Sequence, residues 1–198
     1  MLLLGGTTAV QAVEVATYGS GLKACQAYID GRQQQNADEV PFIDWLSGYL
    51  TGANTASGRT SNILGNADLK GAVYWIGDYC RVHPDSRFAI AAHALLMGAT
   101  AASSRQSTTA IVYGAGFKSC AAFVEARERQ NTDQLIFIDW LGGFLSGVNA
   151  MSLNTNNILG NADLTGAVGW LDSYCRAHPV AQFAMAAQVG IGATPRED

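Results

Sequence analysis

The 198-residue chain contains one sequence twice, and this repeat constrains the fold more than any other feature. Residues 18–96, the first copy, align with residues 113–191, the second copy, at a shift of about 95 positions, and roughly 42 of the 79 aligned positions are identical. The matching stretches include Phe42–Leu46 with Phe137–Leu141, and Asn62–Leu69 with Asn157–Leu164. We therefore expect one fold twice, packed around a pseudo-two-fold axis as in a fused homodimer.

The repeat predicts two small helical units. We expect an N-terminal tail, a first unit, a linker, a second unit and a C-terminal tail at residues 1–17, 18–97, 98–112, 113–192 and 193–198. Apolar residues recur at helical spacing in four segments of each copy, and no segment alternates with a period of two. In the first copy the helices are expected from about Gly21 to Gln35, after Asn36 and Asp38, from Asp68 to His83, and from about Pro84 to Met97. The predicted fold class is all-α, with two tandem four-helix units.

Each copy holds one pair of cysteines, about 55 residues apart. A single ancestral unit could form only that bond internally, so the repeat selects Cys25–Cys80 and Cys120–Cys175 among the three possible connectivities. Each bond would stabilise a small unit by about 4 kcal/mol in the chain-entropy model. A Cys–His nucleophile with His83 or His178 is an alternative, but a histidine followed by proline is more simply a helix end. We predict structural disulfides.

The N-terminus resembles a shortened export signal. Met1–Leu4 is apolar, and Val10–Ala12 resembles a small-residue cleavage site; a disordered tail is the alternative. Together with the disulfides, this predicts a periplasmic or secreted protein. No apolar stretch reaches the roughly 18 residues of a membrane span, so no transmembrane segment is predicted. The net charge is −4 and no Lys/Arg cluster occurs, which argues against binding to nucleic acid.

The loop that is identical in both copies is the first candidate site. Asn62, Asn66 and Asp68 could bind calcium or a polar ligand, although a usual calcium loop has more carboxylates. Asx turns leading into a helix N-cap explain the same residues without a ligand. Ile63 and Leu64 are expected to be exposed and able to contact a partner. The predicted binding residues are therefore Asn62, Ile63, Leu64, Asp68, Asn157, Ile158, Leu159 and Asp163; no metal site or cofactor is predicted.

Tryptophans and glycines form the second candidate. Gly48 and Gly143 lie within predicted helices, where glycine costs about 1 kcal/mol, so we expect close approach of another helix or of a partner. Core packing is the first interpretation of all four tryptophans, which are Trp45, Trp75, Trp140 and Trp170. A partly exposed aromatic patch framed by glycine would instead bind protein. Trp45 and Trp140 are for this reason added to the predicted binding residues.

Sequence patterns give little support for catalysis. Asp44 and Asp139 could pair with Arg81 or Arg176 or act as a general acid, but neither copy offers the second positioned carboxylate that a hydrolase needs. His93 has Gln188 as its counterpart in the second copy. Nucleotide-binding, zinc-protease and nucleophile-elbow motifs are absent from the sequence. We predict a non-enzymatic protein with no catalytic residues.

Two segments of the second copy carry a family resemblance. The run Trp140–Asn149, followed by Trp170–Pro179, resembles the Rap1a/Tai immunity family, in which a glycine-containing helix precedes a His–Pro helix end and an Ala-rich helix. One disulfide in a four-helix unit is similar, more distantly, to the HdeA-like acid-stress chaperones. The resemblance implies an exported helical protein that binds another protein.

The predicted function is therefore protein binding, as an immunity or inhibitor-like protein or as a component of an envelope assembly. An HdeA-like periplasmic chaperone is the alternative, and an enzyme or small-ligand binder is the second alternative. Further oligomerisation is left open. Polar residues of the first copy are lost in the second, where Arg59, Lys70, Asp85 and Arg87 become Asn154, Thr165, Val180 and Gln182. This difference predicts an additional apolar face on the second copy, suited to one asymmetric partner.

Overall fold

The computed structural model describes residues 15–34, 37–57, 62–100, 110–152 and 155–193. Within these ranges every regular element is a helix, which confirms the all-α prediction, and β-pairing is limited to the isolated bridges Ala24–Arg87 and Ser119–Gln182. The α-helices are α1 (Cys25–Gln33), α2 (Val40–Ser57), α3 (Leu69–Val82), α4 (Phe88–Thr100), α5 (Cys120–Glu128), α6 (Asp133–Met151), α7 (Leu164–Ala177) and α8 (Phe183–Ala193); the 3-10 helices are η1 (Gly19–Leu22), η2 (Ala37–Glu39) and η3 (Gly114–Phe117).

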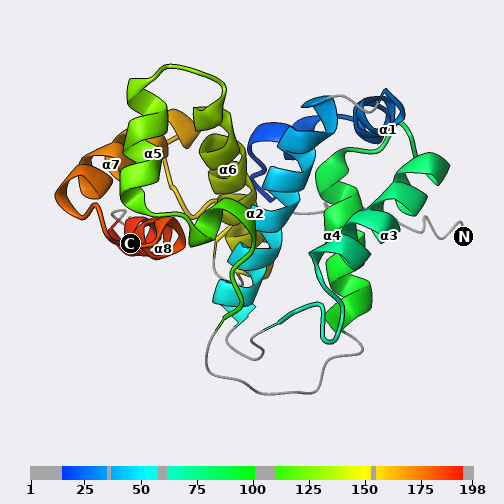
Figure 1. The fold of residues 1–198 in the computed structure, drawn as a ribbon. Coiled ribbons are helices and arrows are strands. Elements are labelled where there is room, and N and C mark those ends of the chain that lie inside the picture. The colour runs from blue at the N-terminus through cyan, green and yellow to red at the C-terminus, as the bar shows by residue number, and fades with distance from the viewer. Residues whose placement is uncertain (1–14, 35–36, 58–61, 101–109, 153–154, 194–198) are drawn as a thin grey trace, which may run out of the picture.

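Helices α2 and α6 lie side by side at the centre of the molecule, with α1, α3 and α4 on one side and α5, α7 and α8 on the other (Figure 1). Glycines make this contact close. A Cβ atom on Gly52 would lie 2.1 Å from the carbonyl oxygen of Phe144, and one on Gly147 would lie 2.1 Å from that of Tyr49. The predicted close approach of a second helix is confirmed, because any side chain at these positions would meet main-chain atoms.

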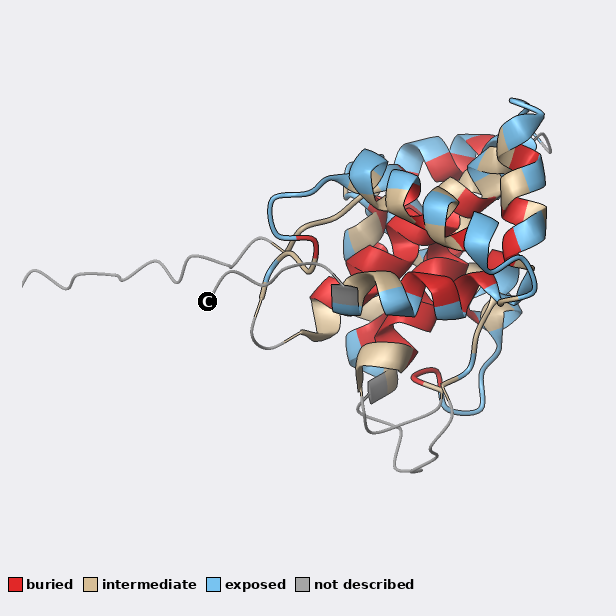
Figure 2. Ribbon diagram, turned by 90° about the vertical axis from the view of Figure 1, so that its left-hand side faces the viewer, coloured by how far each residue is buried: buried red, intermediate tan, exposed pale blue. Residues whose placement is uncertain are grey.

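Two clusters of buried side chains flank the central helix pair, visible as the red interior of Figure 2. Each contains a trio of tilted aromatic rings from equivalent positions. In the first copy, the Phe42 and Phe88 rings are 5.0 Å apart between centroids, with Tyr28 packed against both. In the second copy, Phe137 and Phe183 are also 5.0 Å apart, and Phe123 takes the place of Tyr28. Burial of aromatic side chains of this size supplies much of the apolar surface that a small helical core requires.

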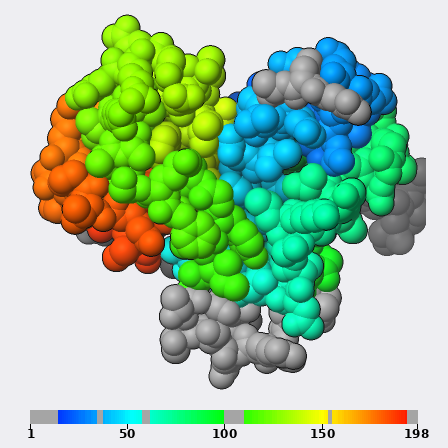
Figure 3. Space-filling view, viewed as in Figure 1, coloured from blue at the N-terminus to red at the C-terminus, as the bar shows by residue number. Residues whose placement is uncertain are grey.

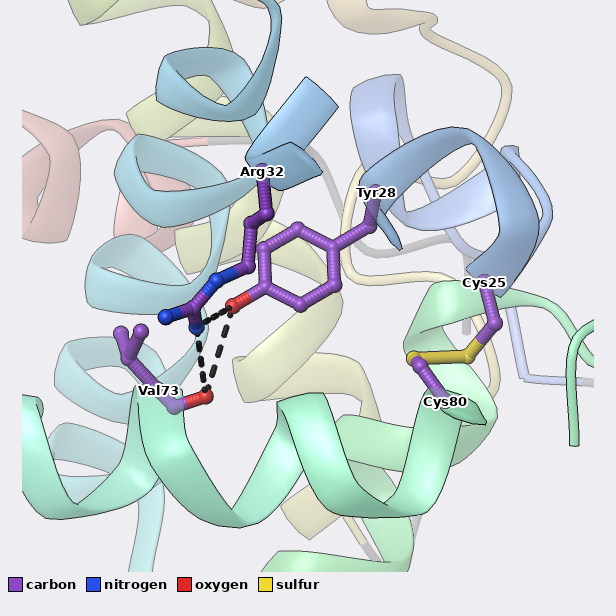
Figure 4. Close-up of a disulfide and its surroundings, with 5 residues drawn as sticks. All are labelled: Cys25, Tyr28, Arg32, Val73 and Cys80. Carbon is purple, nitrogen blue, oxygen red and sulfur yellow. Dashed lines mark hydrogen bonds between the residues drawn. A yellow bond between two sulfur atoms is a disulfide. The ribbon is translucent and has the colours of Figure 1, made fainter. Parts of the chain in front are cut away.

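Both predicted disulfides are confirmed. Cys25–Cys80 joins α1 to the end of α3, and Cys120–Cys175 joins α5 to the end of α7, each with a sequence separation of 55 residues. Figure 4 shows the first of them beside a polar contact between the same two helices. There the Arg32 Nη1 donates to the Tyr28 hydroxyl at 2.9 Å, and this hydroxyl donates to the Val73 carbonyl at 3.3 Å.

The predicted boundaries of the first and fourth helices were wrong. The first helix begins at Cys25 rather than near Gly21, because Gly19 has a φ of 60° and the chain is extended at Ala24, where it pairs with Arg87. The same pairing delays the start of α4 from Pro84 to Phe88, and α4 continues to Thr100, beyond the predicted end of the first unit at residue 97. Local sequence patterns missed the pairing because it joins segments more than 60 residues apart.

The ends of the third helix were predicted correctly. Asp68 is the N-cap of α3, and its carboxylate accepts a hydrogen bond from the Gly71 N–H at 2.8 Å. Asp163 caps α7 in the same way, at 2.8 Å from the Gly166 nitrogen. His83 is the C-cap of α3, as expected of a histidine that precedes proline.

Several predictions fall on residues outside the described ranges. They concern the export signal at Met1–Leu4 and Val10–Ala12, the cap residue Asn36, and the copy difference between Arg59 and Asn154. Among the described helices, none combines the length and the hydropathy that crossing a bilayer requires.

Candidate functional site

The chain segments that precede η1 and η3 each lie against the other copy. The Tyr18 N–H donates to the Ser146 Oγ at 3.0 Å, and the Asn149 side-chain amide donates to the Ala16 carbonyl at 2.9 Å. Equivalent contacts occur on the opposite side, where the Tyr113 N–H donates to the Thr51 Oγ1 at 3.0 Å. In the space-filling view, the segment leading into η3 (green) covers part of the first copy (Figure 3). The two copies are therefore joined by exchanged segments as well as by α2 and α6.

The asparagine that begins the candidate loop in both copies forms a hydrogen bond with an exchanged segment. Asn62 Oδ1 accepts hydrogen bonds from the Leu64 N–H at 3.1 Å and from the Tyr113 hydroxyl at 2.8 Å, and its amide donates to the Gly65 carbonyl at 2.9 Å. The first of these bonds is an Asx turn. In the second copy Asn157 has the same role, with the Tyr18 hydroxyl as donor. Asn62 and Asn157 thus stabilise their loops and tie them to the other copy.

The expectation that Ile63 and Leu64 are exposed is wrong. Ile63 is only 2% exposed and Leu64 and Leu159 are buried as well, while Ile158 is partly buried. The cause is Asn54 on α2, whose Oδ1 accepts a hydrogen bond from the Ile63 N–H at 2.6 Å and draws the loop onto the core. The four apolar residues of the two loops belong to the packing, and a binding role for the loops stays a prediction.

Trp45 and Trp140 are fully buried, so neither contributes to an exposed aromatic patch. The Trp45 Nε1 donates to the Tyr18 carbonyl at 2.6 Å, and the Trp140 Nε1 donates to the Tyr113 carbonyl at 2.8 Å. Each indole therefore holds the segment of its own copy that lies against the other copy. The core-packing interpretation fits these two residues but not Trp75, which is 40% exposed on α3.

Asp44 and Asp139 do not form the pairing with Arg81 or Arg176 that the sequence left open. Arg81 pairs with Asp78, one turn earlier on α3, and Arg176 pairs with Asp172 and Glu128. Asp44 and Asp139 lie early in α2 and α6, and the charge of Asp139 acts on the Asp44 carboxylate. Desolvation, followed by repulsion from Asp139, raises the pKa of Asp44 to about 6, with Lys118 opposing the shift.

Burial also raises the pKa of Asp139, but hydrogen bonding to Ser20 and the charge of Lys23 oppose this increase. The Ser20 hydroxyl donates to its Oδ1 at 2.8 Å, and Lys23 lowers the pKa through its charge. Both carboxylates are therefore partly desolvated. His93, the remaining candidate, lies 3.3 Å from the Tyr49 hydroxyl through its Nδ1, and both partners are replaced in the second copy, by Gln188 and Phe144.

Sequence reasoning missed an apolar pocket in the second copy. The pocket has a volume of about 230 Å³ and lies between α6, α7, α8 and the loop before α7. Its lining consists of Leu141, Leu145, Leu159, Ala162, Gly166, Ala167, Trp170, Leu171, Ala187, Gly190 and Ile191. The signal that could have found it is the replacement of Leu95 by Gly190, a loss of volume in an otherwise apolar position.

Metal chemistry has no candidate among the described residues, where no group of three or more His, Cys, Asp or Glu side chains is placed to hold an ion. The same part of the chain leaves no buried side-chain nitrogen or oxygen without a hydrogen-bond partner. Buried polar groups therefore complete the fold rather than await a ligand.

The chain gave no match to models of known protein families, to curated proteins or to solved structures. The resemblances to the Rap1a/Tai immunity family and to HdeA-like proteins accordingly stay predictions.

Proposed function

We propose that the chain is an exported, non-enzymatic protein-binding module, whose partner binds to the outer face of α8. The observation that carries this proposal is that α8 contains no Lys, Arg, Asp or Glu, although part of it faces solvent. Met185 is 61% exposed there and Val189, one turn later, is also exposed. Exposed apolar side chains that cluster without charge are characteristic of protein interfaces.

The turn before α8, rather than the helix itself, distinguishes the second copy from the first as the proposed binding side. Helix α4 also has no charged residue, and Ile90 and Met97 are exposed on it. The turn before α8 adds Val180, which is 93% exposed, where the first copy has Asp85. This fits the additional apolar face that the sequence differences predict for the second copy. A single asymmetric partner would use that face.

The architecture that we propose for the module is a fused homodimer with a pseudo-two-fold axis between α2 and α6. Reciprocal contacts support it: Gly52 packs on Phe144 as Gly147 packs on Tyr49, and Tyr18 reaches Asn157 as Tyr113 reaches Asn62. Export is supported by the two disulfides, which persist mainly in oxidising compartments. An immunity or inhibitor-like role is the form of binding that the family resemblance favours.

The test is affinity capture by the tagged, oxidised full-length protein from an envelope extract of its own cell. The proposal expects one stoichiometric partner, which the double variant Met185→Lys/Val189→Lys no longer retains because two charges would have to be desolvated. Val82→Lys is the matched control, since Val82 is an exposed valine at the end of α3. Capture of the same partner by the α8 double variant would refute the proposed face.

A further inference from the structure

We infer that the apolar pocket of the second copy binds the alkyl chain of a small amphiphile, with the polar head of the ligand remaining in solvent. This site is distinct from the outer face of α8, because the residues of α8 that line it are Ala187, Gly190 and Ile191 rather than the exposed Met185 and Val189. The inference therefore goes beyond protein binding and does not depend on it.

The chemistry of the lining determines the class of ligand. All side chains around the pocket are aliphatic except for the Trp170 indole, and none is titratable. Such a surface offers a ligand no charge and no catalytic group, so hydrocarbon is the group that gains most from entering it. A dry cavity of about 150 Å³ with comparable lining binds benzene, so a pocket of about 230 Å³ is large enough for a ligand.

The same volume limits the length of the chain. A water molecule occupies about 30 Å³ in the liquid and a methylene group is of similar size, so the pocket holds about eight methylene groups. The lining extends from Ala162 and Gly166, which are exposed, to Leu141 and Leu145, which are each only 2% exposed. A flexible alkyl chain can enter such a pocket end-on from the exposed residues.

A single position distinguishes this pocket from the first copy. Leu95 on α4 packs against the first core cluster, whereas its counterpart on α8 is Gly190. A Cβ atom on Gly190 would lie 2.9 Å from the Trp170 ring, so the indole occupies the space next to the glycine. In the first copy, where Leu95 replaces the glycine, the equivalent Trp75 is 40% exposed. The glycine thus lets the tryptophan lie inward and form a wall of the pocket.

Titration of the oxidised full-length protein with 1-hexanol, 1-octanol and 1-decanol tests the inference, with calorimetry and tryptophan fluorescence as readouts. We expect saturable binding of one 1-octanol per chain. Affinity should rise about fourfold for each methylene group and should level off beyond about eight carbons. Absence of saturable 1-octanol binding would overturn the inference, whatever the result of the protein capture experiment.

Two substitutions on α8 provide a matched pair, since each introduces the residue of the first copy. Gly190→Leu places a side chain against the Trp170 ring, and the leucine and the displaced indole together take up pocket volume, so the variant should weaken 1-octanol binding at least tenfold. Gly192→Met should leave binding unchanged, because a Cβ atom on Gly192 has no neighbour within 4 Å. Unchanged binding in Gly190→Leu, or equal loss in Gly192→Met, would contradict a ligand in this pocket.

Two further measurements keep the inference testable if Gly190→Leu folds poorly. Leu95→Gly should open the equivalent pocket in the first copy and raise the stoichiometry from one 1-octanol to two. The source of the alkyl chain is tested by sedimentation with phosphatidylcholine vesicles, which the wild-type protein should not bind. If the wild-type protein co-sediments with the vesicles and Gly190→Leu does not, the pocket binds membrane lipid, and the inference of a free amphiphile as its ligand is overturned.

Discussion

Gly48 of α2 lies against the main chain of α6 at Trp140, where a Cβ atom on the glycine would come within 1.9 Å of the carbonyl oxygen. The relation is reciprocal, because a Cβ atom on Gly143 would lie 1.9 Å from the carbonyl oxygen of Trp45. No side chain can move to relieve such a contact. The central helix pair therefore depends on glycine at these two positions, and the exchanged segments and both cores are arranged around it.

Replacement of Gly48 by alanine should separate α2 from α6. Overpacking against main-chain atoms costs about 3 kcal/mol, which exceeds the gain in helix propensity of up to about 1 kcal/mol. Urea denaturation of the oxidised protein measures the difference. Gly98→Ala is the control: it lies within α4, a Cβ atom there meets nothing within 4 Å, and it should stabilise the protein. A Gly48→Ala variant as stable as the wild type would show that the helices are not in close contact.

Removal of the Tyr113 hydroxyl should weaken the attachment of the exchanged segment to the loop of the first copy. That hydroxyl donates to the Asn62 Oδ1 at 2.8 Å, and loss of one such bond costs about 1 kcal/mol. Tyr113→Phe should also speed hydrogen exchange at Ile63 and Leu64. Tyr74→Phe provides the comparison, because Tyr74 is exposed on α3 and should change neither quantity. If calcium, rather than Tyr113, organised this loop, chelation and not the substitution would accelerate exchange.

The repeat and its local patterns were sufficient to predict the disulfides, two helix N-caps and one close helix contact. The disulfides follow from one cysteine pair per copy, the N-caps at Asp68 and Asp163 from local spacing that occurs twice, and the need for close packing at Gly48 from the cost of glycine within a helix. Such signals lie within one segment or between residues that the duplication links.

The partners of the exchanged segments and the pocket were not predictable from the sequence. Asn62 bonds to Tyr113, 51 residues away, and without that contact a loop of Asx residues and two aliphatic side chains resembles an exposed binding loop. The pocket was missed for a different reason. The helical spacing of apolar residues indicates which positions of α8 face the core, but it does not show how much side-chain volume is lost where Gly190 replaces Leu95.

Arg32 and Arg127 occupy equivalent positions with different partners, and this suggests a stabilising substitution. Arg127 Nε lies 3.2 Å from the Asp172 Oδ1, whereas the first copy has Gly77 in place of that aspartate. A Cβ atom on Gly77 would lie 3.5 Å from Arg32 Nη1, an ordinary contact. Gly77→Asp should therefore stabilise the protein by about 1 kcal/mol, from helix propensity and one half-exposed ion pair.

Urea denaturation at low and high salt separates the two contributions of Gly77→Asp. The neutral variant Gly77→Asn supplies the gain in helix propensity without the charge, so it should be less stabilised and insensitive to salt. Equal stability of the two variants at low salt would exclude an ion pair with Arg32.

Protonation of Asp44 should stabilise the folded protein as the pH falls. Its pKa is raised from 3.8 to about 6 in the fold, by desolvation first and by Asp139 second, while Lys118 opposes the change. The folded state therefore binds more protons than the unfolded state between these two values, so this contribution increases from pH 6 down to about pH 4. Solvent screening at this partly exposed site limits it to about 1 kcal/mol.

Asp44→Asn removes the titration and keeps the shape of the side chain. We expect the variant to be more stable than the wild type at pH 7, and the difference in the free energy of unfolding to vanish near pH 4. Thermal and urea denaturation across this range measure it, with Asp78→Asn as the control for removal of an exposed carboxylate. An acid-activated chaperone requires the opposite behaviour at its core, namely loosening as acid is added. Wild-type stability that falls steadily from pH 7 to pH 4, with a parallel curve for Asp44→Asn, would contradict the role of Asp44 and favour that alternative.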